Sequence, residues 1–284
     1  MIKILRVEQW SKNLVIFLPA IFANKFSLIF DKNLIIVFLG FSIIASSTYV
    51  YNDLKDIEQD KHHPVKKNRP IARGDISIDK AKIYGIFLYV FGFGLVYITN
   101  KLAIIFIISY SLLTVMYSTY FKYNKYFDFL SITVLFGIRL FLGSFLTGIV
   151  LTNTLSFFTL STITQIVLSK KISILNNYNI RDDIKVKKYL TNNYKNNELN
   201  YLFVFSTISS LLILFFWTLQ WLDEGIIGIS ISIINFFSIC FFNYIFYRDT
   251  YNSNTEDFIS WTRYSKMFFP IIISGLAVMT LLYL

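Results

Sequence analysis

Charged residues are scarce in this 284-residue sequence: they make up 15% of it, whereas hydrophobic residues make up 55%. Such a composition excludes an ordinary soluble domain, in which about 25% of residues are charged. The only cysteine, Cys240, lies in an apolar run, so an intrachain disulfide and a cysteine-based zinc site are excluded. His62 and His63 are adjacent and lack a second ligand pair at metal spacing, which argues against a histidine zinc site.

Long apolar runs recur along the whole sequence. They are about 18 to 22 residues long, enough to cross a hydrocarbon layer about 30 Å thick. We therefore predict an all-α polytopic membrane protein, a single transmembrane catalytic domain over 1–284 with long cytoplasmic loops at 52–81 and 170–199. The nine predicted transmembrane helices are 13–30, 33–51, 82–99, 102–121, 127–151, 154–169, 200–219, 225–246 and 267–284.

The positive charge is distributed unevenly between the two sides of this topology. Of the 27 Lys and Arg residues, 23 lie on the side that carries the N-terminus and the long loops. The positive-inside rule puts this side in the cytoplasm and the C-terminus outside. The net charge of +10 thus reflects membrane topology, and we predict no nucleic-acid partner.

A group of oxygen ligands follows the second apolar run. If the helix continues, Asn52, Asp56 and Asp60 lie on one face at i, i+4 and i+8, with Asp53 beside them. Carboxylates so close together need counter-ions, and Mg²⁺ combines one or two carboxylates with phosphate oxygens. We predict that these four residues bind Mg²⁺ and a diphosphate. The alternative is a solvated helix end paired with nearby lysines.

Basic residues surround this predicted metal site. In the loop that follows it, Arg69 and Arg73 are predicted phosphate ligands, whereas Lys66 is equally well explained by topology. Arg6, Lys12 and Asn13 are predicted to close the pocket from the N-terminal side. Further predicted substrate-binding residues are Tyr117, Lys122, Asp128, Lys170 and Lys171, of which Lys122 and Lys170 are predicted to contact a substrate phosphate.

Arg139 lies eleven residues beyond Asp128 in the fifth span, about 16 Å along a helix at about 1.5 Å per residue. A charge at this depth is most often part of a substrate or ion pathway, so we predict that Arg139 binds the phosphate of a lipid. A structural pair with a carboxylate is the alternative.

The motif Asn52-Asp53-x-x-Asp56-x-x-x-Asp60 resembles the first aspartate-rich motif of the UbiA superfamily of intramembrane transferases. Three further segments are similar to its decaprenyl-phosphate phosphoribosyltransferase branch: Arg6-x-x-Gln9-Trp10-x-Lys12-Asn13, Arg69-Pro70-Ile71-Ala72-x-Gly74, and Tyr117-Ser118-x-x-x-Lys122 followed by Asp128, Arg139 and Gly143. Aromatic prenyltransferases of the superfamily carry a second aspartate motif after span six, where this sequence has Ser169-Lys170-Lys171. Members of the branch usually have Lys-Arg there, so Lys171 is a departure.

The resemblance implies Mg²⁺-dependent transfer of a phosphoribosyl group from phosphoribosyl diphosphate to a polyprenyl phosphate, for cell-envelope polysaccharide precursors. It also implies the bacterial cytoplasmic membrane as the location. Two alternatives stay open: prenyl transfer from a polyprenyl diphosphate to an aromatic or other acceptor, and, outside enzymes, transport of a phosphorylated solute. The sequence leaves the oligomeric state open, a homo-oligomer included.

Overall fold

The computed structural model describes residues 2–23, 25–62, 66–176, 197–219 and 225–252. Every regular element in these ranges is a helix, which confirms the all-α class for this part of the chain. The chain forms two compact units, Met1–Leu151 and Thr152–Leu284, and each is described by itself. The assignment of one catalytic domain to 1–284 stays a prediction.

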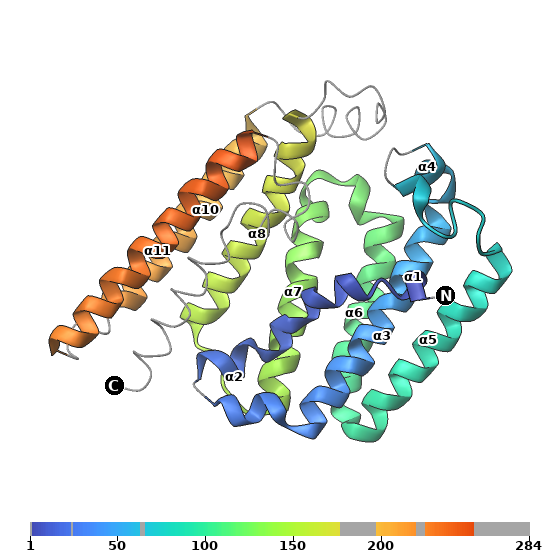
Figure 1. Cartoon of the computed structure of the whole chain (residues 1–284), viewed down its shortest axis with the longest axis horizontal. Coiled ribbons are helices and arrows are strands. Elements are labelled where there is room, and N and C mark those ends of the chain that lie inside the picture. Colours follow the sequence, from blue (N-terminus) through green and yellow to red (C-terminus); the bar gives the residue numbers. More distant parts are fainter. Residues whose placement is uncertain (1, 24, 63–65, 177–196, 220–224, 253–284) are drawn as a thin grey trace. The chain divides into compact units, whose positions relative to one another are not determined.

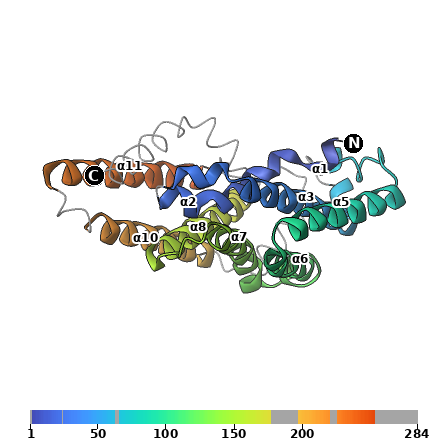
Figure 2. The ribbon, with the colours of Figure 1, turned by 90° about the horizontal axis from the view of Figure 1, so that it is seen from below.

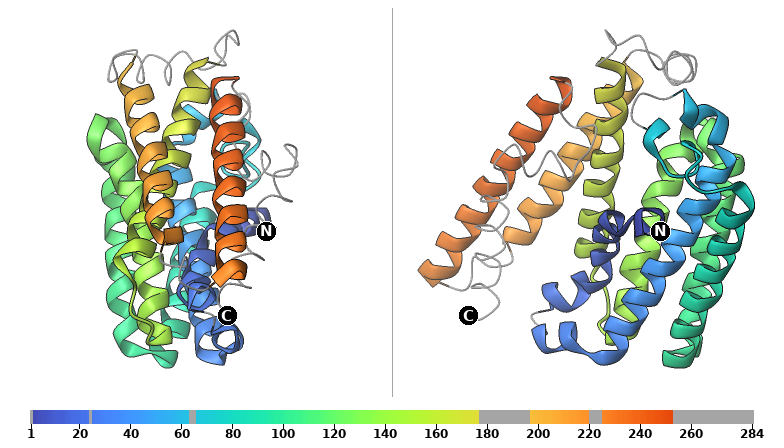
Figure 3. Two further views of the ribbon diagram at one scale, coloured as in Figure 1. Left: turned by 90° about the vertical axis from the view of Figure 1, so that its left-hand side faces the viewer. Right: turned by 45° about the vertical axis from the view of Figure 1, so that its right-hand side comes forward.

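The first unit combines long α-helices with short 3₁₀ segments, labelled η (Figure 1). Its elements are α1 (Ile2–Leu5), η1 (Val7–Phe17), α2 (Leu18–Phe22), η2 (Phe26–Phe30), α3 (Lys32–Lys55), α4 (Ile57–Lys61), η3 (Lys66–Asn68), α5 (Ile78–Thr99), η4 (Lys101–Ala103), α6 (Ile104–Thr119), η5 (Phe121–Tyr123) and α7 (Lys125–Thr147). The second unit contains α8 (Asn153–Asn176), α10 (Glu198–Leu219) and α11 (Gly225–Tyr251), and α10 packs against both of the others (Figure 3).

Seven of the nine predicted spans coincide with helices, from α3 through α11. Within the described residues, five helices are long and apolar enough to cross a membrane: Lys32–Lys55, Ile78–Thr99, Lys101–Thr119, Tyr126–Thr147 and Glu198–Phe216. The predicted span 267–284 lies outside the described residues, so the count of nine stays a prediction.

The predicted first span, 13–30, is wrong as a single helix. The chain is 3₁₀ from Val7 to Phe17, then forms the short helix α2, and a separate 3₁₀ segment follows at Phe26–Phe30. Pro19 explains part of the difference, because proline has no N–H to donate to the preceding turn and is tolerated only in the first turn of a helix, where it lies in α2. The Asp31 side chain then accepts a hydrogen bond from the Leu34 N–H at 2.9 Å and starts α3 as a new helix.

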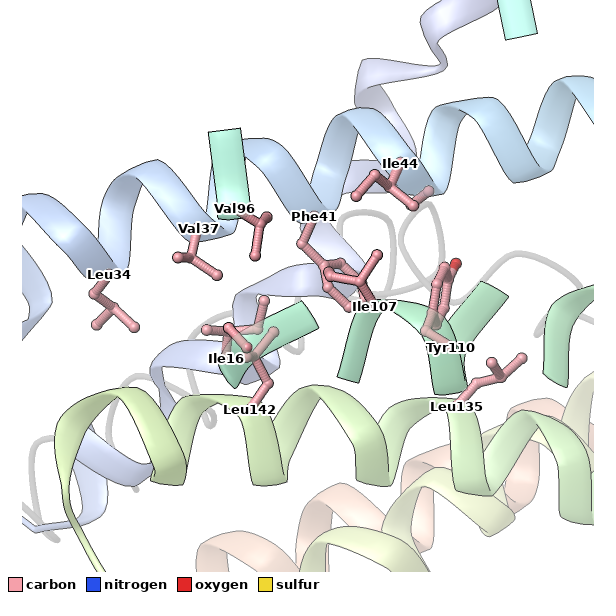
Figure 4. Close-up of a cluster of buried hydrophobic side chains, with 12 residues drawn as sticks. Ile16, Leu34, Val37, Phe41, Ile44, Val96, Ile107, Tyr110, Leu135 and Leu142 are labelled. Atoms are coloured by element: carbon pink, nitrogen blue, oxygen red, sulfur yellow. The ribbon is translucent and has the colours of Figure 1, made fainter. Parts of the chain in front are cut away.

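Helices α3 and α5 lie side by side and form the closest helix pair of the first unit (Figure 2). Gly40 and Gly92 permit this approach, since a Cβ built on Gly92 would stand 2.7 Å from the Gly40 carbonyl oxygen. The core beside them is built from α3, α5, α6, α7 and η1 (Figure 4). Its largest fully buried side chains include Phe41, Ile107 and Leu142. This core fixes α3, whose C-terminal end carries the aspartates.

The N-terminal segment also packs directly on α7. A Cβ built on Gly143 of α7 would stand 2.0 Å from the carbonyl oxygen of Ile16 in η1, so only glycine fits there. The Ile16 and Leu142 side chains lie close together in the core at this crossing (Figure 4). The broken first segment is therefore packed tightly against α7.

Replacing Gly143 with Ala is expected to destabilise the protein by about 1–3 kcal/mol, because the added methyl group forces η1 away from α7. Thermal unfolding of purified protein in detergent would measure this as a lower melting temperature. Gly94→Ala in α5 is the matched control, because a Cβ there meets nothing within 4 Å. Equal melting temperatures for the two variants would contradict the tight packing of η1 on α7.

The second unit has a polar centre within its helices. Gln165 of α8 donates hydrogen bonds to Thr207 Oγ1 of α10 at 3.0 Å and to Asn243 Oδ1 of α11 at 2.9 Å. Polar side chains that pair across apolar helices fix their register. Helix α8 continues to Asn176, so the predicted loop 170–199 begins later than expected, and Lys170 and Lys171 lie on the helix. Much of the rest of that loop, 177–196, lies outside the described residues.

Candidate active site

The aspartate motif spans a break between two helices. Helix α3 ends at Lys55, Asp56 has φ −100° and ψ 9°, and α4 begins at Ile57, so the helix does not continue unbroken through the motif. Two backbone hydrogen bonds cross the break, from Asp56 N to Asn52 O at 3.0 Å and from Asp60 N to Asp56 O at 2.8 Å. The i, i+4 spacing of the motif therefore survives, but its carboxylates face different partners.

Asp53 is paired with an arginine from the N-terminal segment. Arg6 Nη2 lies 2.7 Å from Oδ1 and 2.5 Å from Oδ2 of Asp53, and the carboxylate is buried. Arg6 has φ 48° and ψ 50°, the left-handed conformation that costs a non-glycine residue about 1–2 kcal/mol. Burial lowers the pKa of Arg6, while the charge of Asp53 acts in the opposite direction. A strained, partly desolvated arginine is thus held on this carboxylate.

Arg69 connects two of the aspartates. Its Nη1 lies 3.1 Å from Asp53 Oδ1 and 2.5 Å from Asp60 Oδ2. We call Arg6, Asp53, Asp60 and Arg69 the aspartate–arginine cluster. Its two carboxylates and two guanidinium groups balance in charge, and both carboxylates are buried. Charge-assisted hydrogen bonds of this kind are among the strong ones in proteins, so the cluster joins the N-terminal segment, α3, α4 and the loop after it.

Asp56 faces another cation. Lys122 Nζ, in η5 after α6, lies 2.6 Å from Asp56 Oδ1, and both side chains are largely buried. Burial lowers the pKa of Lys122, but its hydrogen bond and charge interaction with Asp56 outweigh this, and the net shift is upward. The same ammonium lies 5.0 Å from the centre of the Tyr123 ring. From the sequence, Lys122 was predicted to contact a substrate phosphate, but its ion pair with Asp56 was not predicted.

Arg139 is buried, with 3% of its surface exposed, on the face of α7 toward α3 and α6. Its Nε donates to Asn13 Oδ1 at 2.7 Å, its Nη1 to the Leu135 carbonyl at 2.7 Å and its Nη2 to the Tyr110 hydroxyl at 3.3 Å. The rings of Phe41, Tyr110 and Phe136 lie 4.9–5.4 Å from its guanidinium carbon. None of the carboxylate pairs in the described residues includes Arg139.

The other predicted residues differ in position. Tyr117 donates to Asp128 Oδ1 at 3.3 Å, which joins the ends of α6 and α7. Arg73 is exposed and paired with Asp75 outside the aspartate–arginine cluster, so its predicted place among the phosphate ligands stays a prediction. The substrate-binding role of four further residues stays a prediction: Lys12, exposed on η1; Lys66, half-buried in η3; Lys170, exposed on α8; and Lys171, buried on α8.

Serines of α3 are the part of this region that sequence analysis missed. Asn13 Nδ2 donates to Ser42 Oγ at 3.0 Å, and Trp10 Nε1 donates to Ser46 Oγ at 3.0 Å. The indole N–H of Trp10 thus has its hydrogen-bond partner within the protein. The sequence contained a pattern that could have predicted this contact: Ser42, Ser46 and Asp53 lie at i, i+4 and i+11, on one face of a helix.

The donor set suits Mg²⁺ in chemistry. Carboxylate and amide oxygens are ligands that Mg²⁺ accepts, and Arg69 Nη1 already stands between Asp53 and Asp60, where a cation is required. In the part of the chain described, however, no group of three or more His, Cys, Asp or Glu side chains surrounds a single point. The carboxylates would have to exchange their present partners to share one ion, which is consistent with flexible arginine and lysine side chains.

Comparison with known families identifies the fold. A model of the UbiA prenyltransferase family matches residues 13–271. This chain belongs to the UbiA family. It is therefore an integral membrane protein of a transferase family, in agreement with its apolar helices.

Individual relatives match over part of their length. The decaprenyl-phosphate phosphoribosyltransferase of Corynebacterium glutamicum is 30% identical over 158 residues, which are 54% of this chain and 48% of that protein. Protein y4nM of Sinorhizobium fredii is 31% identical over 170 residues, 59% of this chain and 33% of that protein. The chain thus spans between a third and about half of these curated relatives. Together with the family match, these relatives confirm the resemblance predicted from the motifs.

A solved structure supports the UbiA fold independently. The UbiA homologue from Archaeoglobus fulgidus bound to GPP and Mg²⁺ superposes with a TM-score of 0.69, over 98% of both chains, at 15% identity. At this identity the likeness concerns the fold.

Proposed function

We propose that this UbiA-family protein transfers a phosphoribosyl group from phosphoribosyl diphosphate to a polyprenyl phosphate, for cell-envelope polysaccharide precursors. Its site faces the cytoplasm, at a bacterial cytoplasmic membrane. The observation that carries the proposal is the pairing of Asp53, Asp56 and Asp60 with Arg6, Arg69 and Lys122. The partial match to the C. glutamicum decaprenyl-phosphate phosphoribosyltransferase supports the choice of substrates.

The donor would bind through exchange of ion pairs. Asn52, Asp53, Asp56 and Asp60 would hold Mg²⁺, which when bound would neutralise charge on the leaving diphosphate. Arg6 and Arg69, released from the carboxylates, would bind phosphate oxygens, a role for which the forked guanidinium is well suited. Lys66 and Arg73 follow the motif in sequence and are proposed as further phosphate ligands.

The acceptor would enter from the bilayer, and its phosphate would be bound by Lys122, with Lys170 and Lys171 as proposed further contacts. An acceptor oxygen forms a bond to the anomeric carbon while the bond from that carbon to diphosphate breaks, and diphosphate leaves with the electron pair. A phosphate monoester has a second pKa of about 6 and is largely ionised at neutral pH, so the transfer needs no general base. The protein's part is therefore alignment and charge stabilisation.

Prenyl transfer is the second candidate function, and the GPP-bound A. fulgidus homologue favours it. It would use the same first aspartate motif with a prenyl diphosphate. The segment Ser169-Lys170-Lys171 argues against it, because a second carboxylate group would be expected there.

Purified protein with Mg²⁺, a short polyprenyl phosphate and doubly labelled phosphoribosyl diphosphate would test the proposal. The expected result is transfer of the ribose label to the lipid phase while a β-phosphate label stays in the aqueous phase. Asp56→Asn serves as the inactive control, since it removes a proposed metal ligand. No ribose label in lipid, with transfer from geranyl diphosphate to an aromatic acceptor instead, would contradict the proposal and support prenyl transfer.

A further inference from the structure

We propose that Arg139 is a positioning residue: through Asn13 it fixes the N-terminal 3₁₀ segment, and thereby holds Arg6 at Asp53. This role replaces the lipid-phosphate contact that its depth in α7 led us to expect. The proposal rests on the proposed function only for its effect on donor binding, since the docking of the segment is a property of the protein alone.

The contacts of Arg139 point into the protein. Three of its N–H groups donate to Asn13, the Leu135 carbonyl and Tyr110, and three aromatic rings lie against it. A guanidinium can be buried without a carboxylate when neutral oxygens and ring faces share its charge. These partners come from η1, α3, α6 and α7, so Arg139 joins four elements of the first unit. This arrangement commits the side chain to the protein interior.

The N-terminal segment runs along one face of α3, with matching spacing. Asn13 contacts Ser42 and Trp10 contacts Ser46, while Ser46 Oγ also donates to the Leu5 carbonyl at 2.6 Å. Three residues of 3₁₀ helix rise about 6 Å, at about 2.0 Å each. Four residues of α-helix also rise about 6 Å, at about 1.5 Å each. The pairs 13–42 and 10–46 therefore stay in register, and the same direction leads to Arg6 beside Asp53.

This register explains how a distant arginine affects the aspartates. The 3₁₀ segment is eleven residues long, and 3₁₀ runs of more than about four residues are uncommon without tertiary support. Arg6, at its start, is in a left-handed conformation that its contacts must maintain. Arg139 and Gly143 secure the far end of the segment on α7, one through Asn13 and the other through Ile16. Loss of Arg139 should release the segment and free Arg6.

Thiol labelling without substrates would test this. Cys240 is the only cysteine, so Cys240→Ser gives a cysteine-free background. Ile4→Cys then reports docking, because Ile4 is 7% exposed and packs against Val50, Ile71 and Ala81. We expect Arg139→Leu and Asn13→Ala each to speed maleimide labelling about 10-fold, and the double variant to add little, because both remove one interaction. Unchanged labelling in both, or effects that multiply to about 100-fold, would overturn the proposal.

A control separates positioning from general destabilisation. Phe203→Ala removes a fully buried side chain of α10, in the second unit, and should lower the melting temperature while leaving labelling near the background rate. Faster labelling in Phe203→Ala, equal to that in Arg139→Leu, would contradict the role of Arg139.

Kinetics then connects docking with the site. If the protein has the proposed activity, Arg139→Leu and Asn13→Ala should raise the KM for phosphoribosyl diphosphate about 10-fold and leave the KM for polyprenyl phosphate within about twofold. A raised KM for the lipid alone, with unchanged labelling, would instead make Arg139 an acceptor ligand. Because thiol labelling needs no enzyme turnover, it tests the positioning role of Arg139 even if the protein lacks the proposed activity.

Discussion

Asp53→Asn should lower kcat/KM for phosphoribosyl transfer by about 100- to 1,000-fold, comparable to the loss in kcat when one preorganised hydrogen-bond donor is removed from an active site. The amide keeps the size of the side chain but loses the charge that holds both Arg6 and Arg69. The two guanidinium groups would then share Asp60 as their remaining partner within the aspartate–arginine cluster. Initial rates of ribose-label transfer at saturating Mg²⁺ would measure the loss.

Asp75→Asn is the matched control for this variant. Asp75 is also a carboxylate paired with an arginine, but the pair with Arg73 is exposed, and exposed pairs contribute only about 0–1 kcal/mol to stability. We expect transfer within about twofold of the unchanged protein. Asp53→Asn with more than half of the original activity would argue against the cluster as the donor site.

Replacing Lys122 with Ala is expected to reduce kcat/KM by about 100-fold, while Lys122→Arg keeps part of the activity because the charge is retained. The ammonium is the partner of Asp56 and lies largely buried. Steady-state kinetics with both substrates varied would show which phosphate it contacts. Lys61→Ala is the control, since Lys61 is exposed and paired with Glu58 on α4. Equal rates for Lys122→Ala and Lys61→Ala would exclude Lys122 from the reaction.

The pH dependence of this pair has a defined sign. The pKa of Lys122 is raised above its ordinary value of 10.5, so the ammonium is charged throughout the neutral range. Its contribution to stability is complete below that ordinary value and is lost only as the pH rises through the higher folded value. Lys122 should therefore add no step to a pH–rate profile near neutrality.

The sequence was most informative where the pattern is local. Apolar length located the helices from α3 to α11, because a membrane span requires an unbroken apolar run. It failed at 13–30, where the apolar run is long enough but Pro19 and the contacts to α3 and α7 favour short segments. Composition indicates how much apolar surface a segment can bury, whereas the break in the predicted helix 13–30 depends on the residues that pack against the segment.

The candidate site was predictable in its residues but less so in its pairings. Arg6, Arg69 and Lys122 were all identified as cations near the aspartates, but which carboxylate each one meets depends on tertiary structure. The helix break at Asp56 is indicated by no periodicity, and neither is the pairing of Asp56 with Lys122 while Asp53 and Asp60 share Arg69. Arg139 illustrates the same limit: its depth was predictable, while its partner Asn13 lies 126 residues away.

That separation has a consequence for biosynthesis. Asn13 leaves the ribosome 126 residues before Arg139, and Arg6 leaves it 47 residues before Asp53. Until α7 has been made, the N-terminal segment has neither Arg139 nor Gly143 against which to pack. Asn13 and Ile16 can therefore reach their final positions only after α7 has been made, later than many residues that follow them in the chain.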